Sequence, residues 1–355
     1  MRLVFSALLL VSCISLTGQK KVLIEKFTNF SCGTCPNGTL LLQELEAENP
    51  DVIWVLHHKP VGWTDNELEN DQSVTLWNDL NGPGNPTAMF NRVPKGNGLV
   101  STMSSWRTEL EKQLTTPYYA QIAITEVLFN QENRLLEFDV AISFDDIPTS
   151  KDFAISAFVI EDQGESMEQH SYFNNVPGHP LEGKGDIIWN YKHSNAVRAI
   201  LDEPWGSNTV IPTEPVVGET YLSSYSYQIP ASYDVNNMKL VALISNKDDL
   251  SILNREVYNS TQVVLSEIGI TSAEELANTV DIVISPNPAS QFVNFSLSEL
   301  PQSISIYNSE GRAIVTSVPA DLHHSIELSS LAPGTYLVKL QFSDKLQVRK
   351  LSIVR

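Results

Sequence analysis

The sequence has few cysteines, few basic residues, and no long apolar run beyond its first residues. Only three of the 355 residues are cysteine, which excludes a framework of several disulfides. The 23 basic residues are outnumbered by 42 acidic ones, and the formal charge of −19 argues against nucleic acid as a partner, because its binding rests on Lys and Arg at phosphates. With 42% hydrophobic residues the chain can still build cores, and no transmembrane helix is expected in the mature protein.

The first 18 residues resemble a secretory signal peptide. Arg2 precedes an apolar stretch from Leu3 to Val11, and small or polar residues follow through Gly18, where cleavage is expected. A second possibility is a lipoprotein processing box at residues 10–13, in which Cys13 is the lipidated residue. Either route places the mature chain outside the cytoplasm, where disulfides persist.

Residues 19–117 predict a domain that mixes helices and strands. Alternating or short apolar runs predict strands, and leucines or other apolar residues at helical spacing predict helices. The strands are expected at 20–28, 52–58 and 87–92 with a weaker one near Leu99, and the helices at 35–49, 73–80 and 103–114. The order is therefore β-α-β-α-β-β-α.

From residue 118 the pattern changes to period two, which is typical of half-buried antiparallel strands. Strands are expected at 136–144, 152–161, 219–229, 238–245 and 255–265, most economically as a sandwich, with a long loop at 162–184 and a helix at 186–201. Residues 118–280 hold 24 acidic and 8 basic residues, which is expected of a solvated surface. Residues 266–280 have no strand pattern and are interpreted as a linker.

The chemistry is concentrated in one motif, Cys32-Gly33-Thr34-Cys35, between the first predicted strand and the first predicted helix. The mature chain has no other cysteine, so these two can pair only with each other. A thiol at a helix N-terminus meets unpaired backbone N–H groups and the positive end of the helix dipole, which stabilise the thiolate. The second thiol, one turn along, can attack the resulting mixed disulfide. The spacing therefore predicts thiol–disulfide exchange, with Cys32 and Cys35 as the reacting residues.

Two other interpretations of this motif remain open. A zinc site would need two further ligands, but there is no second CxxC, and the adjacent His57 and His58 point to opposite faces of a predicted strand. No metal and no cofactor are expected. The disulfide could also be an inert staple, although closing so short a loop stabilises the fold by only about 2 kcal/mol.

A second element, Gly84-Asn85-Pro86-Thr87, stands directly before the third predicted strand. Proline at the start of a strand costs no ladder hydrogen bond, and a cis Asn85–Pro86 bond is expected close to Cys32.

The succession of strand, CGTC-Pro36, helix, strand and GNPTAMF over residues 20–116 resembles the thioredoxin fold. That resemblance implies that Cys32 attacks, that Cys35 resolves, and that Pro86 is the cis-proline beside the disulfide. In the family this loop contacts the substrate backbone, so Asn85, Pro86 and Thr87 are the implied substrate-binding residues.

The sequence departs from the thioredoxin pattern in one place, because Ser31 stands where the family usually has Trp. Many relatives also bury an acid beneath the disulfide to accept a proton. Glu25 is the nearest candidate for that role, one residue from the usual spacing.

The wider chain resembles the thioredoxin-like family related to outer membrane protein 28. The residues that carry this resemblance are the VLIEKFTNFSCGTCPNG start, the stretch from His193 to Arg198, and Pro204-Trp205-Gly206. Members are outer-membrane or surface proteins, suggested as adhesins. His193 and Arg198 lie on the predicted helix 186–201, where structural roles are expected.

The last 75 residues resemble a type IX secretion C-terminal sorting domain of type A. SPNPAS, the NSEGR hairpin, LAPGTYLVKL and the final KLQVRKLSIVR match it in order and spacing. The resemblance implies interaction of residues 281–355 with the type IX secretion machinery, passage through the periplasm, and a final location on the surface of a Gram-negative bacterium or outside it.

The sequence thus predicts an α/β plus all-β protein. Its parts are a signal peptide at 1–18, a thioredoxin-like domain at 19–117, a central antiparallel β-sandwich at 118–265, a linker at 266–280, and a small C-terminal β-sandwich sorting domain at 281–355. Two functions are compatible with it: thiol–disulfide exchange with a protein substrate, or surface binding and adhesion with a structural disulfide. The sequence does not define the oligomeric state.

Overall fold

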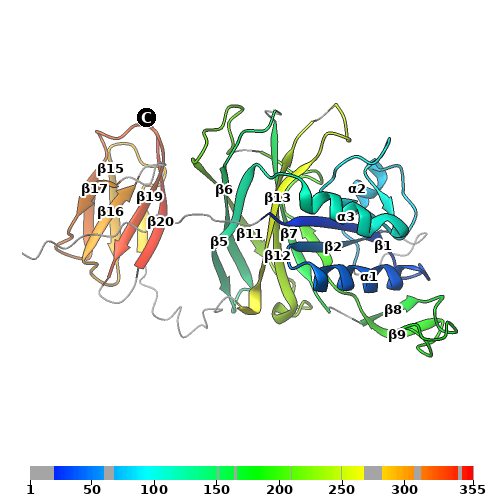
Figure 1. Cartoon of the computed structure of the whole chain (residues 1–355). Coiled ribbons are helices and arrows are strands. Elements are labelled where there is room, and N and C mark those ends of the chain that lie inside the picture. The colour runs from blue at the N-terminus through cyan, green and yellow to red at the C-terminus, as the bar shows by residue number, and fades with distance from the viewer. Residues whose placement is uncertain are drawn as a thin grey trace, which may run out of the picture. The chain divides into compact units, whose positions relative to one another are not determined.

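The computed structural model describes residues 20–59, 68–149, 152–163, 166–208, 210–248, 250–267, 282–307, 313–342 and 346–354 (Figure 1). The chain divides into two compact units, Met1–Ile270 and Thr271–Arg355, and each is described by itself. The predicted signal peptide and nearly all of the predicted linker lie outside the described residues. No helix in the described ranges is long and apolar enough to span a membrane.

The larger unit is built on an eight-stranded sheet with the order β13-β12-β7-β10-β2-β1-β3-β4. The strands are β1 (Val22–Thr28), β2 (Val52–His58), β3 (Thr87–Phe90), β4 (Ser101–Thr102), β7 (Phe153–Glu161), β10 (Ala196–Ile200), β12 (Met238–Asn246) and β13 (Val257–Val264). β1 runs parallel to β2 and antiparallel to β3. The helices are α1 (Cys35–Glu48), α2 (Asp71–Asp79) and α3 (Trp106–Thr115), the last preceded by a short 3-10 turn η1 (Met103–Ser105).

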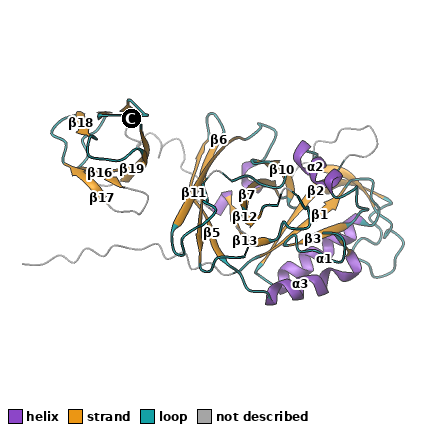
Figure 2. Ribbon diagram, turned by 90° about the horizontal axis from the view of Figure 1, so that it is seen from above, coloured by secondary structure: helices purple, strands orange, loops and turns teal. Residues whose placement is uncertain are grey.

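Helices cover both faces of the sheet around β1 (Figure 2). Leu42 of α1 and Leu110 of α3 share a core with Ile24, whereas Leu76 of α2 shares the opposite core with Leu23. This alternation follows from the two-residue period of a strand, and all of β1 is buried because both of its faces are covered. The helices and strands predicted for residues 20–115 are therefore present, with ends shifted by a few residues.

The other end of the sheet packs against a three-stranded sheet of order β11-β6-β5. Its strands are β5 (Ala120–Asn130), β6 (Leu135–Phe144) and β11 (Thr220–Gln228), and all pairings are antiparallel. Leu240 and Ala242 of β12 face this second sheet, whereas Val241 and Leu243 belong to the core on the α2 side. The predicted sandwich exists, but one of its two sheets continues into the N-terminal strands.

That continuity corrects the predicted boundary between residues 117 and 118. β10 lies between β2 and β7, and the Leu56 N–H donates to the Asn195 carbonyl at 2.8 Å. The apolar run of β2 needs a neighbour on each side because its backbone groups are buried. Strands from the two predicted domains therefore form one sheet and share a core.

The predicted helix over residues 186–201 is wrong. The segment forms β9 (Ile187–Lys192), which pairs with β8 (Ser166–His170), and then β10. Asn190 and Asn195 have positive φ values of 59° and 49°, which an α-helix does not accept. The segment from β8 through β9 occupies most of the predicted loop at 162–184 and lies next to α1 (Figure 1).

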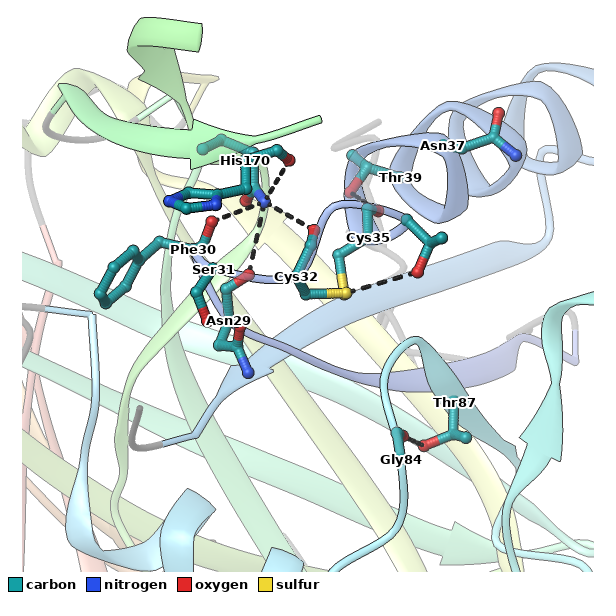
Figure 3. The surroundings of a disulfide bond; sticks show 12 residues. Asn29, Phe30, Ser31, Cys32, Cys35, Asn37, Thr39, Gly84, Thr87 and His170 are labelled. Atoms are coloured by element: carbon teal, nitrogen blue, oxygen red, sulfur yellow. Dashed lines mark hydrogen bonds between the residues drawn. A yellow bond between two sulfur atoms is a disulfide. The ribbon is translucent and has the colours of Figure 1, made fainter. Parts of the chain in front are cut away.

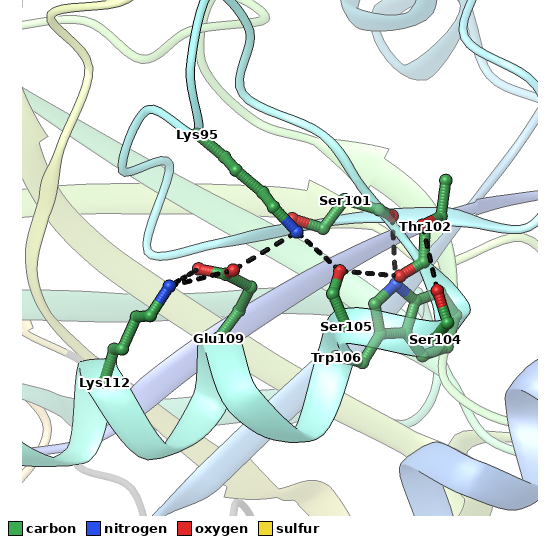
Figure 4. A network of polar contacts seen from close by, with 8 residues as sticks. All are labelled: Lys95, Ser101, Thr102, Ser104, Ser105, Trp106, Glu109 and Lys112. Atoms are coloured by element: carbon green, nitrogen blue, oxygen red, sulfur yellow. Dashed lines mark hydrogen bonds and ion pairs between the residues drawn. The ribbon is translucent and has the colours of Figure 1, made fainter.

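A polar network fixes the start of α3 (Figure 4). The Lys95 Nζ donates to the Ser105 Oγ at 2.6 Å and lies 3.2 Å from the Glu109 carboxylate. The Trp106 indole N–H donates to the Ser101 carbonyl at 3.0 Å, which orients the ring toward the underside of α1. Trp106 is fully buried. Its bond to Ser101 therefore fixes a large core side chain directly beside the surface contacts of Lys95, Ser105 and Glu109.

The smaller unit contains seven strands in two sheets, β14-β15-β18 and β17-β16-β19-β20, among its described residues. They are β14 (Ile282–Ser285), β15 (Phe292–Leu297), β16 (Ser303–Tyr307), β17 (Ala313–Ser317), β18 (His323–Glu327), β19 (Gly334–Gln341) and β20 (Leu346–Ile353). Val293 and Phe295 of one sheet share a core with Ile304, Val338 and Leu351 of the other. This is the all-β sandwich that the sequence predicts, although the predicted turn Ser309–Arg312 lies outside the described residues.

Candidate functional site

The two cysteines lie where β1 has ended and α1 begins. Cys32 and Cys35 form a disulfide with a Cα–Cα distance of 5.3 Å (Figure 3). Cys35 is the first residue of α1 and is 1% exposed, whereas Cys32 lies in the preceding loop and is partly exposed. The predicted pairing and the greater exposure of Cys32 are confirmed. A thiolate from outside would therefore meet Cys32 first.

In the first turn of α1, the Cys35 N–H donates to the Cys32 carbonyl, the Gly38 N–H donates to the Thr34 carbonyl, and Pro36 has no N–H. Thr34 is the N-cap residue, but its side chain makes no capping hydrogen bond, and the turn contains no acidic residue. The Thr34 hydroxyl instead lies 3.6 Å from the Cys32 Sγ. The helix dipole favours negative charge at this position, so it acts in favour of a thiolate once the disulfide is reduced.

The predicted loop before β3 packs onto α1. The Asn85–Pro86 bond is cis, as expected. The Pro86 ring lies 3.3 Å from the place a Cβ would occupy at Gly38, one turn beyond Cys35, so any larger residue there would push the loop away by a few tenths of an ångström. The Thr87 hydroxyl donates to the Gly84 carbonyl at 2.8 Å and closes the loop.

Glu25 lies on the face of β1 that points away from Cys35, which corrects its predicted role in proton transfer. Arg92 donates twice to its carboxylate, each time at 2.8 Å, and the His57 Nε2 lies 3.4 Å away. Burial raises the pKa of Glu25, but the charge and hydrogen bonds of Arg92, together with His57, outweigh burial and lower that pKa to about 2. At neutral pH the carboxylate is therefore held as an anion by Arg92.

The ionisable side chain beneath the disulfide is Lys26, which the sequence analysis did not single out. Its Nζ donates to the Cys35 carbonyl at 2.9 Å and to the Thr39 hydroxyl at 2.7 Å. The side chain is fully buried, and burial lowers its pKa to about 7. The signal was in the alternation of β1, because Lys26 shares the α1 face with Val22 and Ile24.

Two histidines lie near Lys26. The rings of His58 and His193 are 4.9 Å apart and both are buried, and the half-buried Tyr191 ring lies 4.9 Å from His193. Burial, followed by the charge of Lys26, lowers the pKa of His193 to about 3, and burial also lowers that of His58. Both imidazoles are therefore neutral at physiological pH. No three His, Cys, Asp or Glu side chains in the described ranges are placed to hold a metal ion.

His57 faces the opposite side of β2 from His58, as the sequence predicts. Its Nδ1 lies 2.8 Å from the Ser73 hydroxyl, and its Nε2 faces Glu25. This Ser–His–Glu array has the connectivity of a hydrolase triad, but all three side chains are at most 1% exposed. Because a substrate cannot reach a buried hydroxyl, we assign the array a structural role.

The β8–β9 segment covers one side of the CGTC loop. The Gln169 side-chain amide donates to the Phe30 carbonyl at 2.9 Å and to the Cys32 carbonyl at 3.0 Å (Figure 3). The Tyr172 N–H donates to the Gly33 carbonyl at 2.9 Å. Backbone carbonyls around the disulfide are thus held by a segment far away in the sequence, which the predicted loop at 162–184 did not reveal.

Two segments of the chain match known protein families. Residues 283–354 match the secretion system C-terminal sorting domain, which confirms the predicted sorting domain and implies interaction with the type IX secretion machinery. The chain is a protein secreted to the cell surface of a Bacteroidetes-like Gram-negative bacterium. Residues 71–267, more than half of the chain, match the family Outer membrane protein Omp28, and the chain belongs to this family.

Similarity to individual proteins is more limited. No curated protein matches the chain. HBP35 of Porphyromonas gingivalis is similar in fold, with a TM-score of 0.54 and 17% identity over 95% of this chain and 98% of that chain. The BSP domain of a biofilm associated protein has a TM-score of 0.22 and 11% identity over 70% of this chain and 55% of that chain. Dimeric latent PorU from Porphyromonas gingivalis has a TM-score of 0.21 and 13% identity, over 66% and 20%. The last two are too distant to inform the fold.

Proposed function

We propose that this cell-surface protein exchanges disulfides with a protein substrate through Cys32 and Cys35. The observation that carries the proposal is the asymmetry of the disulfide, with Cys32 partly exposed and Cys35 buried at the start of α1. In the reduced protein, the Cys32 thiolate attacks a substrate disulfide and forms a mixed disulfide, and one substrate sulfur leaves as a thiolate. Cys35 then attacks the Cys32 sulfur, which releases the second substrate thiolate and re-forms the protein disulfide.

The arrangement of the N-terminal half supports a thioredoxin-like interpretation of this site. The elements follow the order β1-α1-β2-α2-β3-β4-α3, as the sequence predicts. α1 and α3 cover one face of the sheet, α2 covers the other, and the disulfide stands at the N-terminus of α1 (Figure 2).

The loop formed by Asn85, Pro86 and Thr87 is the proposed contact for the substrate backbone. It packs against α1 at Gly38, in the helix that begins with Cys35. Asn85 and Pro86 are partly exposed, so the backbone of an extended substrate segment can reach this loop.

Insulin reduction tests this proposal. The wild-type protein with a dithiol reductant should accelerate the reduction of insulin disulfides, and Cys32→Ser should abolish the acceleration. Cys35→Ser should instead accumulate a mixed disulfide, because the attack at Cys32 proceeds without the resolving step. Circular dichroism of the two matched variants serves as the folding control. Equal rates for the wild type and Cys32→Ser would refute exchange.

A second candidate is a binding or adhesion protein in which the disulfide is structural. The observation in its favour is the pair of exposed aromatic side chains in the β8–β9 segment, Tyr172 at 73% and Trp189 at 66% exposure. Exposed aromatic side chains are enriched where proteins meet partners. Under this alternative, Cys32→Ser would leave attachment of the bacterium to a surface unchanged, and Trp189→Ala would weaken it.

A further inference from the structure

Lys26 is a buried amine with no anionic partner. Its Nζ contacts two neutral oxygens, the Cys35 carbonyl and the Thr39 hydroxyl. In the described part of the chain, no carboxylate forms an ion pair with it or raises its pKa. An unpaired charge in a protein interior is costly, so a lysine here needs a reason that the oxidised structure does not supply.

The surroundings of Lys26 offer no compensating charge from any packed element. α1 contributes Cys35 and Thr39, β3 contributes the paired Ala88, and β2 contributes His58. The turn after β9 contributes His193. Both histidines have lowered pKa values and are neutral, and the charge of Lys26 disfavours their protonation further. Tyr191 of β9 hydrogen-bonds to Thr39, but burial raises its pKa and its phenol stays neutral. Cys35, whose carbonyl accepts from the Lys26 Nζ, carries a sulfur that reduction can make negative.

We propose that Lys26 is the charge partner of the Cys35 thiolate in the reduced protein, and that reducing the disulfide therefore adds a proton to Lys26. The proposal deepens the proposed exchange at Cys32 and Cys35 and rests on it for its biological purpose. The proposed coupling between the protonation of Lys26 and that of Cys35 does not depend on any substrate. Lys26 acts here as a positioning residue that holds charge beside a reacting sulfur.

The reduction balances with two equivalents of an external thiol. One thiolate attacks Cys32, the bond between the two protein sulfurs breaks, and the Cys35 sulfur leaves with the electron pair as a thiolate. A second thiolate attacks the mixed disulfide, releases Cys32 as a thiolate and forms the external disulfide. Of the two protons lost by the external thiols, one binds the neutral Lys26 amine, and the other binds Cys32 below the pKa of that thiol or is released to solvent above it. The products are a Cys35 thiolate beside a Lys26 ammonium, Cys32 as a thiol or a thiolate according to pH, and one oxidised external disulfide.

The thiol titration of a single-cysteine protein tests the coupling. In the Cys32→Ser background only Cys35 can form a thiolate, which is followed by its ultraviolet absorbance as pH rises. Adding Lys26→Met removes the ammonium while keeping the length of the side chain. Because an opposite charge close by lowers a pKa by about 1–3 units, the pKa of Cys35 should rise by about that much, a tenfold or larger loss of thiolate at a given pH.

Lys20→Met in the same background is the matched control. Lys20 also donates from its Nζ to backbone carbonyls, at 2.6 Å to Gln113 and 2.5 Å to Thr116. It lies six residues before Lys26, roughly 20 Å along the extended chain, so it should leave the titration of Cys35 unchanged. Coincident curves with and without Lys26→Met, or an equal shift from Lys20→Met, would overturn the proposal.

A second measurement needs no substitution in the lysine. The pKa of Lys26, followed by NMR of its side-chain Nζ and Cε, should be higher in the reduced wild-type protein than in the oxidised one. An unchanged value would overturn the proposal even if Lys26→Met did not fold. Failure of insulin reduction would instead count against the proposed function alone, because neither titration involves a substrate.

Discussion

The ring of Tyr172 lies directly on the backbone of Gly33, between the two cysteines. A Cβ placed on residue 33 would lie 2.5 Å from two ring atoms of Tyr172, closer than side-chain carbons approach. Gly33 does not have a positive φ, so glycine is required here for space and not for backbone conformation. The composition of the CGTC loop is thus tied to a residue in a distant segment.

Gly33→Ala should therefore destabilise the protein through Tyr172. Tyr172 is 73% exposed, so its ring can turn away from residue 33, and we expect a loss of about 0.5–1.5 kcal/mol in the free energy of unfolding from the displaced rotamer. Tyr172→Ala should be mild alone and should recover most of the loss in the double variant. Urea unfolding of the four proteins gives the coupling energy. Additive effects would show that the ring can move aside at no cost.

The two thiols of the reduced protein should react unequally with iodoacetamide. Cys32 is partly exposed beside the N-terminus of α1, where the helix dipole favours negative charge, so its pKa should fall below the free value of about 8.5. Near pH 6, mass spectrometry of peptides should find Cys32 alkylated first, because Cys35 is buried. Equal labelling, or labelling that begins only above about pH 8, would support a structural staple.

The buried pair of Glu25 and Arg92 should make the fold sensitive to acid. The folded pKa of Glu25 is about 2 and the unfolded value is 4.5, so the unfolded chain binds the extra proton between those values. This stabilisation is complete above pH 4.5 and is lost as pH falls toward 2, by about 3 kcal/mol, at 1.36 kcal/mol for each pKa unit.

Urea unfolding between pH 2 and 7 measures that loss. Glu25→Gln should lower the free energy of unfolding at pH 7 by about 3–5 kcal/mol, because Arg92 then remains buried and unpaired. It should also reduce the acid limb, which is the fall in the free energy of unfolding as pH drops from 4.5 to 2. Arg107→Gln breaks an exposed pairing with Glu44 and Glu48 and should leave the acid limb as it is. An acid limb in Glu25→Gln as steep as in the wild type would assign the effect to other groups.

The sorting domain should determine where the protein accumulates. A chain that ends after residue 280 lacks the segment that matches the sorting domain, so it should remain in the periplasm. Protease treatment of intact cells, followed by fractionation, measures the exposed fraction. Residues 281–355 fused to an unrelated periplasmic protein should carry that protein to the surface, and a fusion that stays in the periplasm would contradict the assignment.

The sequence predicted local elements well, because their signals are local. β2 has the predicted ends at residues 52 and 58, and α1 begins at Cys35 where a helix start was expected. The smaller unit also has the predicted β-sandwich architecture. In these segments, the apolar period and the turn residues agree with the tertiary environment.

The failures arose where a residue's role depends on a distant segment. The spacing of apolar residues in 186–201 fits a helix. β10 nevertheless forms a strand because it pairs with β2 and β7, which no local pattern reveals. Glu25 and Lys26 are adjacent, and only the placement of α1 and Arg92 decides which one lies under the disulfide. The contact of Tyr172 with Gly33 likewise depends on the path of the β8–β9 segment.

The position of β10 also constrains the order in which the protein can fold. On the side of β2 away from β1, Leu56 pairs with Ala196, so this edge of β2 stays open until most of the larger unit has been synthesised. Contacts between such distant residues slow folding, and an open apolar edge invites pairing with other chains. A fragment ending at residue 117 should therefore aggregate, whereas one spanning residues 20–267 contains every strand of the sheet.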